Sequence, residues 1–173
     1  QGKVLDQVKN PKYIVMDTMN LWIDIARDEL FKTIARVDML IINDGEARQI
    51  TGQSNLLHAA KQIREMGPRH LIIKKGEHGA LLFTEDDILS APAFPLTEIN
   101  DPTGAGDTFL GGFIGWLDKA GEINRDNLRK AVIYGSVMAS FCVQKFGPES
   151  LFDLGENAVA ERYYAFKELA RIP

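Results

Sequence analysis

The first half of the chain alternates between short apolar runs and segments with helical spacing. The runs at residues 13–16, 37–42 and 70–74 are continuous and strand-like. Between them, apolar residues recur at helical intervals at residues 25–34 and again at residues 56–66. Because a helix between two such strands favours parallel pairing, the pattern predicts βαβ units and a sheet that is parallel at its centre.

The second half predicts a change of architecture. Gly76 and Gly79 precede another apolar run at residues 80–83, a spacing that favours a hairpin with glycines at the bend and an antiparallel edge. An extended stretch interrupted by prolines follows at residues 88–99. Three helices are then expected, the first of them largely buried, at residues 109–117, 126–143 and 156–170. The sequence therefore predicts an α/β fold with a mainly parallel sheet, an antiparallel edge hairpin and C-terminal helices.

Composition is that of an ordinary single-domain globular protein. The chain has 173 residues, of which 45% are hydrophobic and 25% are charged. The formal net charge of -4 gives no electrostatic footprint for nucleic acid, and no apolar run approaches the ~20 residues that cross a bilayer. The single Cys142 is expected to be a buried small hydrophobe in a reducing compartment. We therefore expect a cytoplasmic protein that binds neither nucleic acid nor membrane.

Residues 101–109 read Asp-Pro-Thr-Gly-Ala-Gly-Asp-Thr-Phe and lead directly into an apolar helix. Gly104 and Gly106 leave the backbone free to turn successive N–H groups toward one point. The dipole of the following helix adds positive potential at that point, which favours a phosphate. Asp107 would repel such an anion unless it orients the hydroxyl of a nucleophile. The alternative is that Asp107 is an ordinary first-turn acid, favoured by the helix dipole.

This stretch resembles the C-terminal signature of the ribokinase-like (PfkB) carbohydrate kinases, written approximately D-T-x-G-A-G-D-x-F. Pro102 departs from the more usual threonine and leaves the Gly-Ala-Gly-Asp core intact. The resemblance implies a three-layer α/β/α fold in which the backbone of Gly104, Ala105 and Gly106 forms an anion hole for the transferred phosphoryl group. It also implies that Asp107 is the catalytic base and that the ligands are ATP and Mg2+.

Two further segments resemble nucleotide-site motifs of the same family. Asn43 and Glu46 match its N-x-x-E motif, whose Glu helps to position magnesium through water. The alternative is a capping box, in which Asn at the N-cap and Glu three residues later satisfy a helix start, and both interpretations can hold together. Lys74, Gly76 and Gly79 match a K-x-G-x-x-G segment that lies beside the nucleotide. A solvated hairpin tip is the alternative explanation of these three residues.

The resemblance also assigns residues around the glycine loop. Thr103 belongs to the loop itself and is placed in the nucleotide site with it. Ser136 matches a small polar residue next to adenine, and the alternative is a small residue that eases helix packing. Asp101 and Ser150 would surround a monovalent cation, K+, which tightens the anion hole, while the alternative for Asp101 is a turn residue before proline. Residues 17–20 depart from the family's D-x-N-x-R form, and no role is assigned to them.

These residues predict an ATP-dependent phosphotransferase that moves the γ-phosphate to a hydroxyl of a sugar or nucleoside. The alternative is a catalytically silent nucleotide- or metabolite-binding regulatory module on the same fold. Gln1 is not an initiator methionine, and members of the resembled family have substantial chain before this point. Residues 1–173 are therefore expected to be the C-terminal, nucleotide-binding part of one ribokinase-like kinase domain, without its N-terminal substrate-binding and lid region. The acceptor, a homodimer through that lid and the activity of this part alone stay open.

Overall fold

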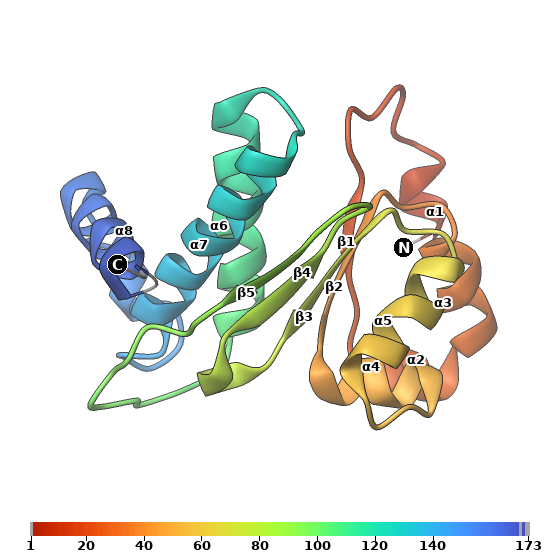
Figure 1. The fold of residues 1–173 in the computed structure, drawn as a ribbon, viewed down its shortest axis with the longest axis horizontal. Helices are drawn as coiled ribbons and strands as arrows, with labels where there is room; N and C mark the ends of the chain where they lie inside the picture. The colour runs from red at the N-terminus through yellow and green to blue at the C-terminus, as the bar shows by residue number, and fades with distance from the viewer. Residues whose placement is uncertain (1, 170, 172–173) are drawn as a thin grey trace. The chain divides into compact units, whose positions relative to one another are not determined.

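The computed structural model describes residues 2–169 and 171, and these residues form two compact units. The first unit comprises residues 1–75 and 81–89, and the second comprises residues 76–80 and 90–173. Among the described residues, no helix has both the length and the apolar character needed to cross a membrane. In chain order (Figure 1) the elements are α1 Gly2–Leu5, β1 Val15–Asp17, α2 Asn20–Ile25, α3 Arg27–Ile34, β2 Met39–Asn43, α4 Asp44–Thr51, α5 Leu56–Glu65, β3 His70–Lys74, η1 Gly76–His78, β4 Ala80–Phe83, β5 Ile88–Ala91, α6 Ala105–Ala120, α7 Arg125–Cys142, η2 Glu149–Leu151 and α8 Glu156–Leu169.

Three parallel strands form the centre of the first unit. β1 pairs with β2, and β2 pairs with β3 in a register that runs from Met39 opposite His70 to Asn43 opposite Lys74. In Figure 1, helices α2 to α5 gather beside these strands. The aliphatic side chains of β2 and β3 are buried, as expected for a parallel sheet that helices cover. The predicted parallel centre is confirmed, and β3 occupies the predicted residues.

The far edge of the sheet is built from short connections. The strand order is β1-β2-β3-β4-β5. Residues 75–79 alone connect β3 to β4, and residues 84–87 alone connect β4 to β5. Parallel neighbours need a crossover of a dozen or more residues, so both connections are antiparallel hairpins. The predicted edge hairpin is confirmed, and β5 ends directly before Pro92, which has no N–H to donate to a ladder.

Several helices differ from the sequence-based expectation. The helix predicted at residues 25–34 corresponds to α3, which begins two residues later because Ala26 leaves the helical conformation with φ -141° and ψ 36°, and the sequence pattern does not predict the preceding helix α2. The sequence predicts α4 only through the capping box at Asn43. The expectation that α6 is largely buried is wrong, because only one stripe of it is covered and three of its 16 residues are buried. The predicted end of the last helix at Ala170 lies outside the described residues.

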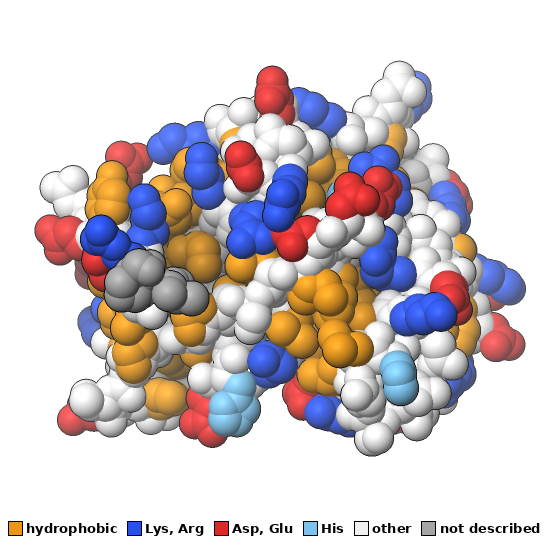
Figure 2. Space-filling model, in the orientation of Figure 1, with side chains coloured by type: hydrophobic (Ala, Val, Ile, Leu, Met, Phe, Trp, Pro, Cys, Tyr) orange, Lys and Arg blue, Asp and Glu red, His pale blue; other side chains and the backbone are white. Residues whose placement is uncertain are grey.

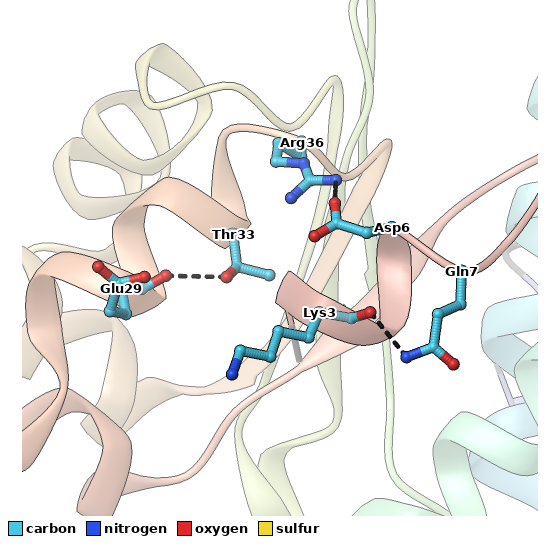
Figure 3. A network of polar contacts seen from close by, with 6 residues as sticks. All are labelled: Lys3, Asp6, Gln7, Glu29, Thr33 and Arg36. Atoms are coloured by element: carbon cyan, nitrogen blue, oxygen red, sulfur yellow. Dashed lines mark hydrogen bonds and ion pairs between the residues drawn. The ribbon is translucent and has the colours of Figure 1, made fainter.

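One ion pair connects the turn after α1 to the turn after α3 (Figure 3). Arg36 Nη2 lies 2.6 Å from Asp6 Oδ1 in an exposed ion pair. Within α3, the Thr33 hydroxyl donates to the Glu29 carbonyl at 2.8 Å. Exposed ion pairs contribute only ~0–1 kcal/mol, so the packing of Leu5 against the hydrophobic core is the larger contribution at this end of the chain.

A buried histidine lies at the amino end of β3. His70 is 6% exposed, and its Nδ1 lies 2.7 Å from the Tyr13 hydroxyl. Burial lowers the pKa of His70, Arg69 and Arg64 lower it further by charge repulsion, and Glu85 acts against them. The folded protein therefore favours a neutral ring that is hydrogen-bonded to the Tyr13 hydroxyl.

We expect the protein to lose stability as pH falls below about 6.5, the pKa of an unperturbed histidine. The unfolded chain then binds a proton that folded His70 does not bind, so the free energy of unfolding decreases until pH passes below the lowered pKa of the folded state. One such group contributes a slope of at most ~1.4 kcal/mol per pH unit. Urea unfolding of the wild type and of His70→Asn between about pH 5 and 8 measures it. Equal slopes for the two proteins would contradict this prediction.

Candidate functional site

The glycine loop leads into α6, the second-longest helix among the described residues, which begins without a side-chain cap. Gly104 is the N-cap of α6 in the left-handed conformation, with φ 79°, and no side chain caps the helix. The Ala105 N–H donates to the Pro102 carbonyl at 3.2 Å, and the Thr108 N–H donates to the Gly104 carbonyl at 2.9 Å. The first turn thus lacks the side-chain acceptor that most helix starts have. Its N–H groups and the helix dipole are suited to an anion, as the sequence predicts.

Asp101 holds this loop through both of its carboxylate oxygens. Oδ1 accepts the Thr103 N–H at 2.9 Å, and Oδ2 accepts the Gly147 N–H at 3.2 Å. Hydrogen bonds from Thr103 and then from Gly147 lower the pKa of Asp101, which keeps the carboxylate charged. Asp101 therefore makes the predicted turn before the helix, and its role at a monovalent cation stays a prediction. Asp107, in contrast, is exposed in the first turn of α6.

Cys142 lies against the glycine loop. It is 1% exposed, and its Sγ lies 3.6 Å from the Thr103 carbonyl and 3.7 Å from the Gly147 carbonyl. A Cβ on Gly104 would lie 3.8 Å from the same sulfur. The predicted burial of Cys142 is confirmed, but its surroundings are the loop carbonyls and not only apolar side chains.

Two glycines bring α6 and α7 close together. A Cβ on Gly112 would lie 2.8 Å from the Tyr134 carbonyl, and a Cβ on Gly135 would lie 2.8 Å from the Phe109 carbonyl. Larger side chains would therefore force the two helices apart. Ser136 follows Gly135 and is half-buried on α7. The close approach of the two helices depends on Gly135 and not on Ser136. The placement of Ser136 next to adenine stays a prediction.

Ser150 fits the hypothesis of a cation ligand. Its hydroxyl oxygen is buried and has no hydrogen-bond partner among the described residues. A buried hydroxyl without a partner is uncommon, because its desolvation is then uncompensated. It lies in η2, three residues after Gly147, whose N–H binds Asp101. An oxygen of this kind suits a monovalent cation, although Asp101 already accepts two N–H groups.

In the first unit, the predicted residues meet at the carboxyl ends of the parallel strands. Asn43 ends β2 and Lys74 ends β3, directly opposite each other in register. The capping box is present: Glu46 N–H donates to Asn43 Oδ1 and Asn43 N–H donates to Glu46 Oε2, both at 2.8 Å. Burial is the main cause that raises the pKa of Glu46, and the charge of nearby Asp17 adds to it. The hydrogen bond from the Asn43 N–H and the charge of Lys74 lower the pKa but do not cancel the effect of burial.

Glu46 is 5% exposed, and the capping box uses its Oε2 and not its Oε1. Among the described residues, no group of three or more His, Cys, Asp or Glu side chains could enclose a metal ion. Magnesium that is held mainly by water and phosphate needs only one protein carboxylate. The residues therefore fit an indirectly held magnesium ion and do not fit a metal enclosed by protein ligands.

Gly76 and Gly79 shape the turn before β4 in the second unit. Both have positive φ, 55° and 82° respectively, and the turn is the 3-10 helix η1. A Cβ on Gly79 would lie 2.0 Å from the Ala91 carbonyl, whereas a Cβ on Gly76 would meet nothing within 4 Å. The predicted glycine bend is confirmed, and only Gly79 is required by close backbone packing.

The structure thus brings Asn43, Glu46 and Lys74 together in the first unit, and it holds Asp101 and Thr103 against the turn at Gly147 in the second. Gly79 lies instead against Ala91. Figure 2 shows hydrophobic side chains exposed beside α5, where the first unit has a hollow of about 450 Å³. None of its lining residues is a predicted site residue, and they include Leu57, Lys61, Arg64, Phe83 and Ile88. Sequence reasoning missed the contact of Cys142 with Thr103 and that of Asn100 with Gln144, because the partners lie 39 and 44 residues apart in the chain.

The mainly parallel sheet, the edge hairpin and the glycine-led helix define an α/β protein of ribokinase-like fold. Residues 4–153 match the family model described as pfkB family carbohydrate kinase, and the chain belongs to this family.

Individual relatives agree with this assignment. The chain is 34% identical over 127 residues to cytidine kinase of Thermococcus kodakarensis, and this alignment covers 72% of this chain and 44% of the relative. It is 28% identical over 129 residues to ribokinase of Staphylococcus aureus, with 72% and 41% covered. The crystal structure of aminoimidazole riboside kinase from Salmonella enterica, complexed with aminoimidazole riboside and an ATP analogue, has a TM-score of 0.75 at 26% identity and covers 87% of this chain and 52% of its own. The chain therefore spans about half the length of the proteins it matches.

Proposed function

We propose that the protein transfers the γ-phosphate of ATP to a hydroxyl group of a sugar or nucleoside. The observation that supports this most directly is the start of α6, where a 16-residue helix begins at left-handed Gly104 without a side-chain cap and presents Asp107 in its first turn. A positive helix end beside an exposed carboxylate suits phosphoryl transfer. The helix end can stabilise the transferred phosphoryl group, while the carboxylate can accept the proton of the acceptor hydroxyl.

In this proposal Asp107 orients the acceptor hydroxyl and accepts its proton as the oxygen bonds to the γ-phosphorus. The bond from the γ-phosphorus to the β–γ bridging oxygen breaks, and ADP leaves. The backbone N–H groups of Gly104, Ala105 and Gly106 stabilise the charge on the transferred phosphoryl group. The Ala105 N–H donates to the Pro102 carbonyl, so this bond opens when Ala105 takes part. The proton moves to Asp107 late, because a loose transition state needs orientation more than a strong base.

The same proposal assigns the remaining ligands. Asn43, Glu46, Lys74, Gly76, Gly79, Thr103 and Ser136 form the nucleotide site. Magnesium, when bound, neutralises phosphate charge, and Glu46 holds its water shell. Asp101 and Ser150 would hold K+. The ATP analogue in the Salmonella relative supports ATP as the phosphate donor.

We further propose that residues 1–173 are the nucleotide-binding part of one kinase domain, and that the choice of acceptor depends on chain beyond them. The relatives' names support an acceptor from the sugars and nucleosides, since they include cytidine kinase and ribokinase. The shares of those relatives that this chain covers, 44% and 41%, support a larger complete protein.

The test is phosphate transfer by the complete protein, with ATP and a panel of sugars and nucleosides, followed by direct detection of the phosphorylated product. The proposal expects turnover with at least one acceptor and dependence on Mg2+. Saturable nucleotide binding without product from any acceptor would instead favour the catalytically silent regulatory module.

A further inference from the structure

The segment that leads into the glycine loop is tied to the turn after α7. Asn100 donates its backbone N–H to the Val143 carbonyl at 2.9 Å and its side-chain Nδ2–H to the Gln144 carbonyl at 2.7 Å. The next residue, Asp101, accepts the Gly147 N–H at 3.2 Å. The Asp101 N–H also donates to the Val143 carbonyl at 3.4 Å, so four hydrogen bonds fix residues 100 and 101 onto one turn. The position of the loop that follows depends on the position of that turn.

Arg162 on α8 contacts the same turn and the end of α7. Its Nη1 donates to the Gln144 side-chain Oε1 at 2.9 Å and to the Ser140 hydroxyl at 3.2 Å. The guanidinium carbon lies 3.5 Å from the centre of the Phe141 ring and 5.1 Å from that of Phe94. A planar cation held by a ring face and two oxygens is fixed in orientation, which lysine would not reproduce.

We propose that Arg162 is a positioning residue for the loop at residues 101–107, acting through Gln144 and Asn100. Gln144 connects the two because its side chain accepts from Arg162 while its backbone carbonyl accepts from Asn100. The inference rests on the proposed function, in which this loop holds the transferred phosphoryl group. Small displacements of groups that orient reacting atoms cost rate strongly, so a helix that makes no contact with the substrate still affects turnover.

The first test is amide hydrogen exchange in the complete protein, which does not require activity. Arg162→Met and Gln144→Leu remove the two sides of one hydrogen bond and keep side-chain volume, and Lys167→Met is the matched control on the same helix. We expect the Thr103 and Gly147 amides to exchange roughly tenfold faster in the first two variants, about the effect of one hydrogen bond, and to be unchanged in the control. A change confined to α8, or an equal change in the control, would overturn the proposal.

The second test is steady-state kinetics with thermal unfolding measured in parallel. Positioning predicts that kcat falls several-fold, on the order of tenfold, in Arg162→Met and in Gln144→Leu, and that the double variant loses no more than either single one. A purely structural role would lower the melting temperature and leave kcat per folded molecule unchanged, which would also overturn the proposal. If the wild type transfers no phosphate, the proposed function fails, while hydrogen exchange still decides whether Arg162 positions the loop.

Discussion

Replacing Asp107 by Asn in the complete protein is expected to lower turnover by at least ~100-fold, the lower end of the effect of general acid–base catalysis. The amide keeps the size of the carboxylate but cannot accept the hydroxyl proton. Nucleotide affinity is expected to change little, because Asp107 is exposed in the first turn of α6 and the proposal places it at the acceptor. Product formation at saturating acceptor, with nucleotide binding measured separately, tests the two expectations.

Asp126→Asn is the matched control for this experiment. Asp126 is also an exposed first-turn acid, but it stands on α7, whose N-terminus is capped by the Asn124 side chain through the Asn127 N–H. Its loss removes the same favourable interaction with a helix dipole without touching the glycine loop. Near-normal turnover in Asp107→Asn, or an equal loss in both variants, would show that Asp107 is only a first-turn acid.

Most of the fold could be predicted because its signals are local. β3 and β4 are continuous apolar runs bounded by polar residues or glycine, and both occur at the predicted residues. Helix α2 and its separation from α3 could not be predicted, since no cap or spacing distinguishes residues 20–25 and only the backbone dihedrals at Ala26 reveal the break. Arg27 at the start of α3 donates to the Ile50 carbonyl at 2.6 Å, a contact across 23 residues that no local pattern contains.

The candidate site shows the same division between local and distant contacts. The capping box of Asn43 and Glu46 could be predicted because its partners are three residues apart. The link from Asp101 to the Gly147 N–H spans 46 residues, so no local pattern contains it, and only the family resemblance places Asp101 near Ser150. Motif resemblance gives the chemistry expected of the glycine loop, whereas its supports on α7 and α8 become visible only through tertiary contacts.

Gly79→Ala is expected to destabilise the protein by at least ~3 kcal/mol, because two costs coincide at this position. The residue has φ 82°, a conformation that strains any side chain with a Cβ. The added Cβ would also lie 2.0 Å from the Ala91 carbonyl oxygen and 2.7 Å from the Pro92 carbonyl carbon, which are backbone atoms that cannot rotate away. The end of β5 would have to move. Urea unfolding of the variant and the wild type measures the difference.

Gly76→Ala separates the two costs. Gly76 has φ 55°, but a Cβ there meets nothing within 4 Å, so only backbone strain of about 1 kcal/mol is expected. Similar losses in the two variants would contradict the packing argument.

The pair also tests the nucleotide hypothesis for this turn. If the turn serves only to pack Gly79 against Ala91 and does not contact the nucleotide, then Gly76→Ala leaves nucleotide affinity intact. If the backbone at Gly76 must lie against the nucleotide, this variant loses affinity while it keeps nearly all of its stability.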